Sequence, residues 1–363
     1  MKLVEEIRPG ANRYINGQGA VDDLDRVMAD YQQAIVVTGE KSYAAFRQNY
    51  HGEVTCPVFR YDGSASDEDG HAIAKQAPAQ TDVVIGIGGG RVLDTAKVTA
   101  ETLKADLISV PTLASNCAPF TPVGAIYHPV GHTFKYVEYF KKAPTVTIVD
   151  YNIMLTTPHD FFVAGIGDTL AKWYEMEGIT RGRINDLPVF TRLSYQTAKV
   201  IKNTLVDSAQ TALADLEEGR VSPAFTDVVD CIIGIASEVG GFGVSDGRMA
   251  GAHAVHNGLS YIEETHEILH GSKVAYGILV QLAQTGDQAE IETLLPFYRG
   301  IGLPTNLAEL HITTDVATKS QQVAQWAARA DETFNLIKSD VVAADVLADM
   351  QKVEDISAGN KQQ

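Results

Sequence analysis

The sequence predicts an α/β domain built on a parallel sheet, residues 1–157, followed by an all-helical domain, residues 158–363. In the first part, short runs of β-branched residues alternate with segments of helical pattern, and after about residue 158 only helical spacing of apolar residues remains. The chain has 363 residues, of which 45% are hydrophobic and 21% charged, so two such domains can each bury a core.

Four apolar runs in the first part are predicted to be strands. They are AIVVTG (34–39), DVVIGIG (82–88), DLISVP (106–111) and TVTIVD (145–150). Because helical segments separate them, we expect a parallel sheet with helices on both faces. Ligands of such sheets bind at the carboxyl ends of the strands.

The second part is predicted to be helical throughout. Its clearest segment, FTRLSYQTAKVIKNTLVDSAQTALADLEEG (190–219), carries apolar residues at the spacing of one helix face. The sequence shows no internal repeat and no low-complexity segment.

Charge and composition exclude several kinds of partner. The net charge of −17 at pH 7 repels nucleic acid, and no basic cluster interleaved with aromatic residues offsets it. The start MKLVEEIRPG has two glutamates where a secretion signal needs apolar residues, and no run reaches the ~18 apolar residues of a membrane span. We expect a cytoplasmic protein with neither nucleic acid nor membrane as partner. Cys56, Cys117 and Cys231 form no CxxC pair, so we expect free thiols.

A glycine-rich turn lies in DVVIGIGGGRVLDTAK, residues 82–97. N–H groups at the start of a helix attract anions, so Gly86, Gly88, Gly89 and Gly90 suggest a phosphate close to the backbone. Arg91 replaces the last glycine of the usual GxGxxG fingerprint, and no GK[ST] follows, so neither common phosphate-binding motif fits. On these residues alone, a tight strand-to-helix turn without a ligand is an equal alternative.

Four further stretches follow the glycine turn in a fixed order. They are VPTLASNCAP (110–119), AGIGDTLAKWYE (164–175), AHAVHNGL (252–259) and HGSKVAYGILVQL (270–282). Together with the glycine turn they resemble the iron-containing alcohol dehydrogenase superfamily, specifically its glycerol dehydrogenase branch, over residues 35–290. The resemblance implies a Rossmann-like dinucleotide-binding domain plus a helical domain, as in dehydroquinate synthase-like folds. It also implies NAD or NADP as cofactor, a small-molecule substrate and a homo-oligomer between dimer and octamer.

Hydride transfer from an alcohol requires loss of the hydroxyl proton, which a divalent metal promotes. Asp168, His253 and His270 are the candidate ligands, but the residues alone leave the choice open, because His256 and His266 stand nearby. Asp168 would also suit a helix N-cap. The resemblance selects Asp168, His253 and His270, which would also be the catalytic residues.

The resemblance also bears on the identity of the metal. Iron-type members carry a further histidine four residues after the aspartate, whereas this chain has Lys172. One oxygen and two nitrogen ligands with an open position suit catalytic zinc. We therefore expect Zn²⁺, or another divalent metal such as Fe²⁺.

The resemblance further assigns the dinucleotide site. Asp94 and Lys97 would tie the glycine turn to its helix, although a surface ion pair explains their spacing equally well. Glu175 and Trp173 are expected to serve packing and surface rather than chemistry. The residues expected to line the cofactor are Gly39, Gly88, Gly89, Gly90, Arg91, Asp94, Thr112, Ser115, Thr121, Val123 and Tyr127.

Two departures from the glycerol dehydrogenase pattern concern selectivity. Gly39 stands where NAD-preferring relatives have an acidic residue, although Glu40 follows it and Lys41 could bind a 2′-phosphate. Cys117 replaces an aspartate that contacts polyols, so we expect it at the substrate. The stretches PTLASNCAP (111–119) and AGIGDTLAKWYE (164–175) together resemble a subgroup that reduces 2-oxo acids to 2-hydroxy acids with NADPH.

In HGSKV a serine, Ser272, stands where the family has a glutamate, which alters the surroundings of His270. A lyase of the dehydroquinate synthase type is a distant alternative, since no basic cluster accompanies the metal motifs. A catalytically dead binding protein is a third hypothesis. The favoured function is hydride transfer between a nicotinamide and a small alcohol, polyol or 2-hydroxy acid.

Overall fold

The computed structural model describes residues 6–131 and 133–359. Contacts within the chain divide it into two compact units. The sheet unit comprises Ile7–Phe162 and Ala214–Gly241, and the helical unit comprises Val163–Leu213 and the described residues from Phe242 onward. Residues 214–241 thus group with the sheet rather than with the other helices. The predicted domain boundary after residue 157 stays a prediction, because units defined by contacts within the chain are not the same as domains that fold independently.

The sheet unit is built on six parallel strands in the order β1-β8-β5-β4-β2-β3. Its central strands are buried along their whole length, as the runs of valine and isoleucine require. The strands are β1 (Arg13–Gly17), β2 (Ala34–Thr38), β3 (Val58–Arg60), β4 (Val83–Gly88), β5 (Asp106–Pro111) and β8 (Val146–Asp150).

The four strands expected from the sequence are confirmed as β2, β4, β5 and β8. β1 and β3 were not predicted, because they form the two edges of the sheet and are only partly buried, so their apolar runs are weak. Nor was the antiparallel hairpin of β6 (Val123–Tyr127) and β7 (Phe134–Tyr139), whose strands pair with each other outside the main sheet.

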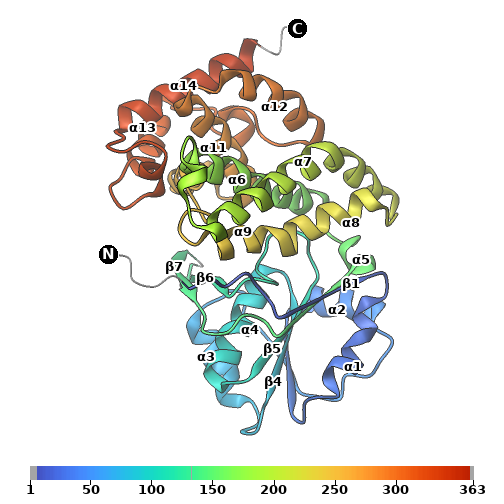
Figure 1. Ribbon diagram of the computed structural model, residues 1–363. Helices are drawn as coiled ribbons and strands as arrows, with labels where there is room; N and C mark the ends of the chain where they lie inside the picture. The colour runs from blue at the N-terminus through green and yellow to red at the C-terminus, as the bar shows by residue number, and fades with distance from the viewer. Residues whose placement is uncertain (1–5, 132, 360–363) are drawn as a thin grey trace. The chain divides into compact units, whose positions relative to one another are not determined.

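Helices cover both faces of the sheet, as expected. α3 and α4 lie on one side and α1 and α2 on the other (Figure 1). These helices are α1 (Leu24–Met28), α2 (Glu40–Asn49), α3 (Asp67–Gln76), α4 (Gly90–Leu103) and α5 (Tyr151–Met154). α8 (Pro223–Asp230) and α9 (Ala236–Gly243) are joined by a π-helical turn at Cys231–Ile235.

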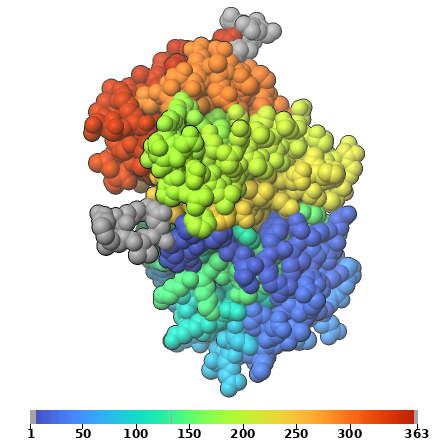
Figure 2. Space-filling model, in the orientation of Figure 1, coloured from blue at the N-terminus to red at the C-terminus, as the bar shows by residue number. Residues whose placement is uncertain are grey.

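The helical unit contains no strand among its described residues, which confirms the fold class. The space-filling view shows the orange and red side chains of α12, α13 and α14 as one continuous surface (Figure 2). The helices are α6 (His159–Thr180), α7 (Val189–Glu218), α10 (Gly251–Leu259), α11 (His270–Thr285), α12 (Gln288–Ile301), α13 (Val316–Ala327) and α14 (Ala343–Gly359). The 3₁₀ turns of the chain are Ala20–Asp23, Ile184–Asp186, Glu263–Thr265, Leu307–Leu310 and Thr333–Leu336. Within the described part of the chain, no helix has the length and apolar character needed to cross a bilayer.

Candidate functional site

Several segments predicted to bind a dinucleotide begin at the carboxyl ends of neighbouring strands. β2 ends at Thr38, directly before Gly39, β4 ends at Gly88, and β5 ends at Pro111, directly before Thr112. These three strands are neighbours in the sheet. Their carboxyl ends therefore form a continuous row, as expected for a ligand site of a parallel sheet.

The close approach at the first two glycines comes from the protein itself. A Cβ on Gly86 would lie 2.8 Å from the Cβ of Ala96, and one on Gly88 would lie 2.5 Å from the Cβ of Val92. Both neighbours belong to α4, which packs directly against the backbone of β4. Helix packing therefore explains these two glycines without a ligand.

The next two glycines meet the loop that follows β5. A Cβ on Gly89 would lie 2.9 Å from Leu113 Cδ1, and one on Gly90 would lie 2.9 Å from Asn116 Nδ2. Gly89 is the N-cap of α4 and offers no side chain to accept from the N–H groups of the first turn. This helix start is suited to an anion.

Arg91 and Tyr127, both predicted cofactor residues, contact each other. The Arg91 guanidinium lies 4.8 Å from the centre of the Tyr127 ring, and its Nη1 donates to the Gly63 carbonyl at 3.3 Å. Burial raises the pKa of the Tyr127 hydroxyl. The neutral side chain of Tyr127 thus packs against the exposed, positively charged Arg91 beside the glycine turn.

Asp94 and Lys97 form a buried pair, so the surface-pair alternative is wrong. Lys97 Nζ donates to Asp94 Oδ1 at 2.9 Å and to the Val123 carbonyl at 2.7 Å. The second oxygen of Asp94 accepts from the Ala125 N–H at 3.1 Å. Burial raises the pKa of Asp94, and Lys97 partly offsets this effect. The pair therefore fixes α4 to β6.

The loop after β5 is tied to the glycine turn. The Thr112 N–H donates to the Gly88 carbonyl at 3.1 Å, and the Thr121 N–H donates to the Cys117 carbonyl at 3.1 Å. Ser115 and Cys117 are half-buried between these anchors. The structure thus brings the predicted cofactor residues of this loop next to the start of α4.

Gly39 directly follows β2 in an extended conformation that any residue can adopt. Its N–H donates to Ser42 Oγ at 3.1 Å, and a Cβ would lie 3.0 Å from Tyr61 Cε1. The position therefore presents backbone rather than a carboxylate, as the sequence analysis expected.

Arg60, which the sequence analysis missed, ends the neighbouring strand β3. The register pairs Thr38 with Arg60, which places this arginine beside the end of β2. Its Nε lies 2.7 Å from Glu40 Oε1, and its guanidinium lies 4.4 Å from the centre of the Tyr43 ring. A basic residue after the short run VF was the available signal.

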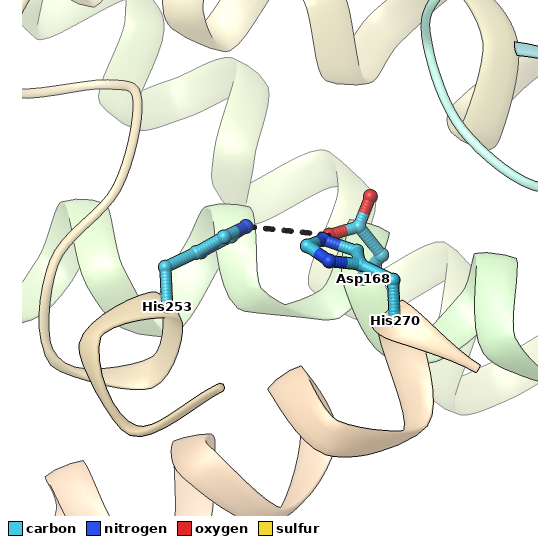
Figure 3. Close-up of side chains that lie close together, drawn as sticks. All are labelled: Asp168, His253 and His270. Carbon is cyan, nitrogen blue, oxygen red and sulfur yellow. Dashed lines mark ion pairs between the residues drawn. The ribbon is translucent and has the colours of Figure 1, made fainter. Parts of the chain in front are cut away.

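In the helical unit, three helices bring Asp168, His253 and His270 together (Figure 3). Asp168 lies in the middle of α6, so the N-cap alternative is wrong. His253 lies on α10, and His270 is the first residue of α11. Of the other two candidate histidines, His266 is exposed, and neither it nor His256 belongs to the group.

Glycines allow these helices to meet. A Cβ on Gly271 would lie 1.8 Å from the Ala164 carbonyl of α6, and one on Gly277 would lie 2.3 Å from the Ala252 carbonyl of α10. The backbone of α11 therefore lies directly against both other helices. This is the physical reason for a glycine after His270.

The donor atoms are spaced as a metal site requires. Asp168 Oδ1 lies 3.4 Å from His253 Nε2 and 3.2 Å from His270 Nε2. Oδ1 is buried and has no hydrogen-bond partner within the described residues. Ligands of a tetrahedral zinc ion, at bond lengths of about 2.1 Å, lie about 3.4 Å apart. The residues present therefore fit a divalent metal.

Charge in the cluster is strongly coupled. Burial raises the pKa of Asp168, but the two histidines outweigh it and hold this pKa well below its usual range. Burial lowers the pKa of His253, but Glu175 and Asp168 raise it to about 9. The His270 side chain is 52% exposed, so the cluster opens to solvent on that side.

Glu175 was expected to serve packing or the surface, but it contacts a predicted metal ligand. It is buried two helical turns after Asp168, and its Oε2 lies 2.8 Å from His253 Nδ1. Burial raises the pKa of Glu175, but the effect of His253 is opposite and outweighs it, so this pKa lies below its ordinary value. The spacing of seven residues on one helix was the signal that could have found it.

His256 is a neighbour of the cluster rather than a member. Its Nε2 lies 2.9 Å from His270 Nδ1, and its Nδ1 lies 3.0 Å from Asn257 Oδ1. Burial, and after it the electrostatic effect of His270, holds the pKa of His256 well below its usual range. A neutral imidazole therefore contacts His270.

Lys172, four residues after Asp168, is turned away from a ligand role. Its Nζ donates to the Arg248 carbonyl at 3.0 Å. The cluster thus offers three protein ligands, as the sequence analysis expected from the absence of a histidine here.

Comparison with known proteins gives a consistent family. The family model described as "Iron-containing alcohol dehydrogenase" matches residues 11–151. Hydroxycarboxylate dehydrogenase A of Escherichia coli K12 is 35% identical over 354 residues, which cover 96% of this chain and 97% of that protein. A glycerol dehydrogenase of Thermotoga maritima is 34% identical over 362 residues, which cover 95% of each.

Solved structures agree with the sequence relatives. A probable glycerol dehydrogenase of Sinorhizobium meliloti 1021 has a TM-score of 0.85 at 27% identity and covers 98% of this chain and 100% of its own. The glycerol dehydrogenase of Schizosaccharomyces pombe has a TM-score of 0.87 at 26% identity, covering 99% and 93%. The chain therefore belongs to the iron-containing alcohol dehydrogenase family of NAD-linked alcohol and polyol dehydrogenases and is glycerol dehydrogenase-like.

Proposed function

We propose that this protein is a metal-dependent dehydrogenase that moves a hydride between a nicotinamide cofactor and a small alcohol, polyol or 2-hydroxy acid. The observation that carries this proposal is the cluster of Asp168, His253 and His270, with a buried, unpartnered oxygen on Asp168. A divalent metal held there acidifies an alcohol and polarises a carbonyl. The dehydrogenases and reductases among the relatives favour oxidoreduction over a cyclising lyase.

The proposed roles of the chain's residues follow from their positions. Asp168, His253 and His270 hold the metal, and the half-exposed side of His270 leaves access for the substrate oxygen. The start of α4, with Gly88 to Arg91, holds the cofactor's pyrophosphate, because N–H groups and the helix dipole favour an anion there. Of the other predicted cofactor residues, Gly39 and Thr112 directly follow β2 and β5, Ser115 and Thr121 lie in the loop after β5, and Val123 and Tyr127 lie in β6, whereas Asp94 is buried against Lys97.

A second candidate is NADPH-dependent reduction of a 2-oxo acid. Gly39 leaves the end of β2 without a carboxylate, and Arg60 places a guanidinium on the adjacent strand end, where it could pair with a 2′-phosphate. Cys117 stands where the family has a polyol-binding aspartate. Identity of 35% to hydroxycarboxylate dehydrogenase A adds support.

Removal of single ligands tests the metal centre. We expect His253→Ala and His270→Ala each to lose bound zinc and turnover, because three protein ligands leave none to spare. His266→Ala is the matched control, since this histidine is exposed and outside the cluster. Normal zinc content in either ligand variant, measured by elemental analysis of purified protein, would refute the assignment.

The substrate class needs a separate assay. We propose screening polyols and 2-oxo acids against NADH and NADPH or their oxidised forms, with and without added zinc. Efficient glycerol oxidation with NAD, and no activity on 2-oxo acids, would favour an ordinary glycerol dehydrogenase over the second candidate.

A further inference from the structure

Both oxygens of the buried Glu175 carboxylate are used on α10. Oε1 accepts from the N–H of Ala250 at 2.7 Å and from the N–H of His253 at 3.0 Å. Oε2 lies 2.8 Å from Nδ1 of the His253 ring. One side chain of α6 therefore contacts both the backbone and the ring of the same histidine.

The backbone contacts complete the start of α10. Ala250 is its N-cap and has no side chain that can accept a hydrogen bond. N–H groups in the first turn lack helix partners, so a local serine or aspartate usually satisfies them. Glu175 does this from another helix, and its negative charge suits the positive end of the helix dipole.

The ring contact determines which nitrogen of His253 carries the proton. A carboxylate accepts hydrogen bonds only, so Nδ1 must be the N–H of the neutral ring. The lone pair then lies on Nε2, the atom 3.4 Å from Asp168 Oδ1. His270 is oriented indirectly, because its Nδ1 contacts His256 Nε2 while His256 Nδ1 lies 3.0 Å from Asn257 Oδ1, an oxygen that only accepts. His253, by contrast, contacts a carboxylate directly.

We propose that Glu175 is a positioning residue that fixes the tautomer and direction of His253 so that its Nε2 faces the metal. This inference rests on the proposed metal site. Nothing in the role requires Glu175 to touch the metal or the substrate. Its partners are the backbone and ring of His253.

Glu175→Gln separates this role from simple helix capping. Two backbone N–H groups converge where Oε1 lies, so the glutamine must place its amide oxygen there and its NH₂ against Nδ1. Nδ1 then has to accept, which moves the ring proton to Nε2 and blocks the coordinating atom. The cap survives in this variant, whereas the tautomer is reversed.

We expect Glu175→Gln to bind zinc tenfold to a hundredfold more weakly, as for other changes of residues that orient a ligand histidine. Zinc affinity is measured by competition with a fluorescent chelator. The thermal midpoint of the metal-free protein should fall less than in Glu175→Ala, because the backbone cap is kept while only the charge is lost. Glu175→Ala removes both contacts and should lower midpoint and affinity together.

Glu177→Gln is the matched control, because Glu177 lies on the same helix and pairs with Arg181 near the surface. A second readout needs no metal. Nitrogen NMR of histidine side chains, at a pH where the ring is neutral, should show His253 protonated at Nδ1 in the wild type and at Nε2 in Glu175→Gln.

The outcomes distinguish this inference from the proposal on which it rests. Wild-type zinc affinity in Glu175→Gln, or an unchanged His253 tautomer in it, would overturn the positioning role alone. A wild-type protein that binds no zinc would overturn the metal site and, with it, the purpose assigned to Glu175. Loss of stability in Glu175→Gln without loss of affinity would reduce Glu175 to a structural cap.

Discussion

Introducing a carboxylate at Gly39 should shift cofactor preference from NADPH toward NADH. Gly39 lies between the end of β2 and the start of α2, in an extended conformation that aspartate can adopt. An aspartate here would repel a 2′-phosphate and accept hydrogen bonds from ribose hydroxyls. In the wild type we expect NADPH to bind at least as well as NADH.

The size of the shift follows from charge and screening. Two unit charges about 6 Å apart repel by about 3 kcal/mol at an effective dielectric constant of about 20. The end of β2 borders the exposed Glu40 and Arg60, where salt weakens such repulsion, so we expect about 1–3 kcal/mol. That corresponds to a change in the NADPH-to-NADH affinity ratio of roughly 5- to 150-fold.

Steric cost must be separated from charge. A Cβ at position 39 would lie 3.0 Å from Tyr61 Cε1 and 3.2 Å from Ser42 Oγ, so any side chain displaces these neighbours slightly. Gly39→Ala measures that common cost, and Gly39→Asn adds the shape of aspartate without its charge. The affinities of each variant for NADPH and for NADH are measured by titrating nicotinamide fluorescence. If the aspartate and asparagine variants share one ratio, the electrostatic argument is refuted.

Two other predictions concern substrate and stability. Cys117→Asp should raise glycerol oxidation and depress 2-oxo acid reduction, because a carboxylate binds hydroxyls and repels a carboxylate substrate; unchanged kcat/KM for both substrates would contradict this. Burial raises the pKa of Asp349 from 3.8 to about 7. The folded protein therefore retains a proton that the unfolded chain loses, and this contribution to stability disappears as pH rises from about 4 to about 7. Asp349→Asn should be more resistant to urea than the wild type at pH 8, with a smaller difference at pH 5. Asp345→Asn, which breaks an ion pair that lowers the pKa of Asp345, should instead be less resistant at pH 8. Equal pH dependence of the wild type and Asp349→Asn would contradict the assignment.

The parts of the fold that could be predicted from the sequence are those in which complete burial requires a continuous run of apolar residues. β4, with VVIGIG buried throughout, can be recognised from its apolar run alone. β3 could not, because a three-residue edge strand with two exposed side chains has no such pattern. The β6–β7 hairpin was not predicted because it lies outside the main sheet, where β6 buries only alternate residues and β7 buries none completely.

Phosphate binding, the reason for which the glycine turn was recognised in the sequence, explains only some of its glycines. Gly86 and Gly88 are required by helix packing, which depends on where Ala96 and Val92 lie in three dimensions. No local pattern separates them from Gly89, which lies where the N–H groups at the start of α4 suit an anion. Sequence reasoning can therefore identify such a turn without assigning each glycine its cause.

The charges around His253 provide a last argument about the metal. Asp168 and Glu175 are two carboxylates whose pKa values lie below the ordinary range, and His253 lies between them, 3.4 Å from one and 2.8 Å from the other. With neutral imidazoles, the two carboxylates carry a combined charge of about −2, which a divalent cation cancels. Without a cation, the proton on His253, whose pKa is raised to about 9, replaces part of that charge. Glu175 thus serves the site through charge as well as hydrogen bonds. A neutral glutamine would keep the backbone hydrogen bonds but remove the charge and reverse the hydrogen bond to the His253 ring.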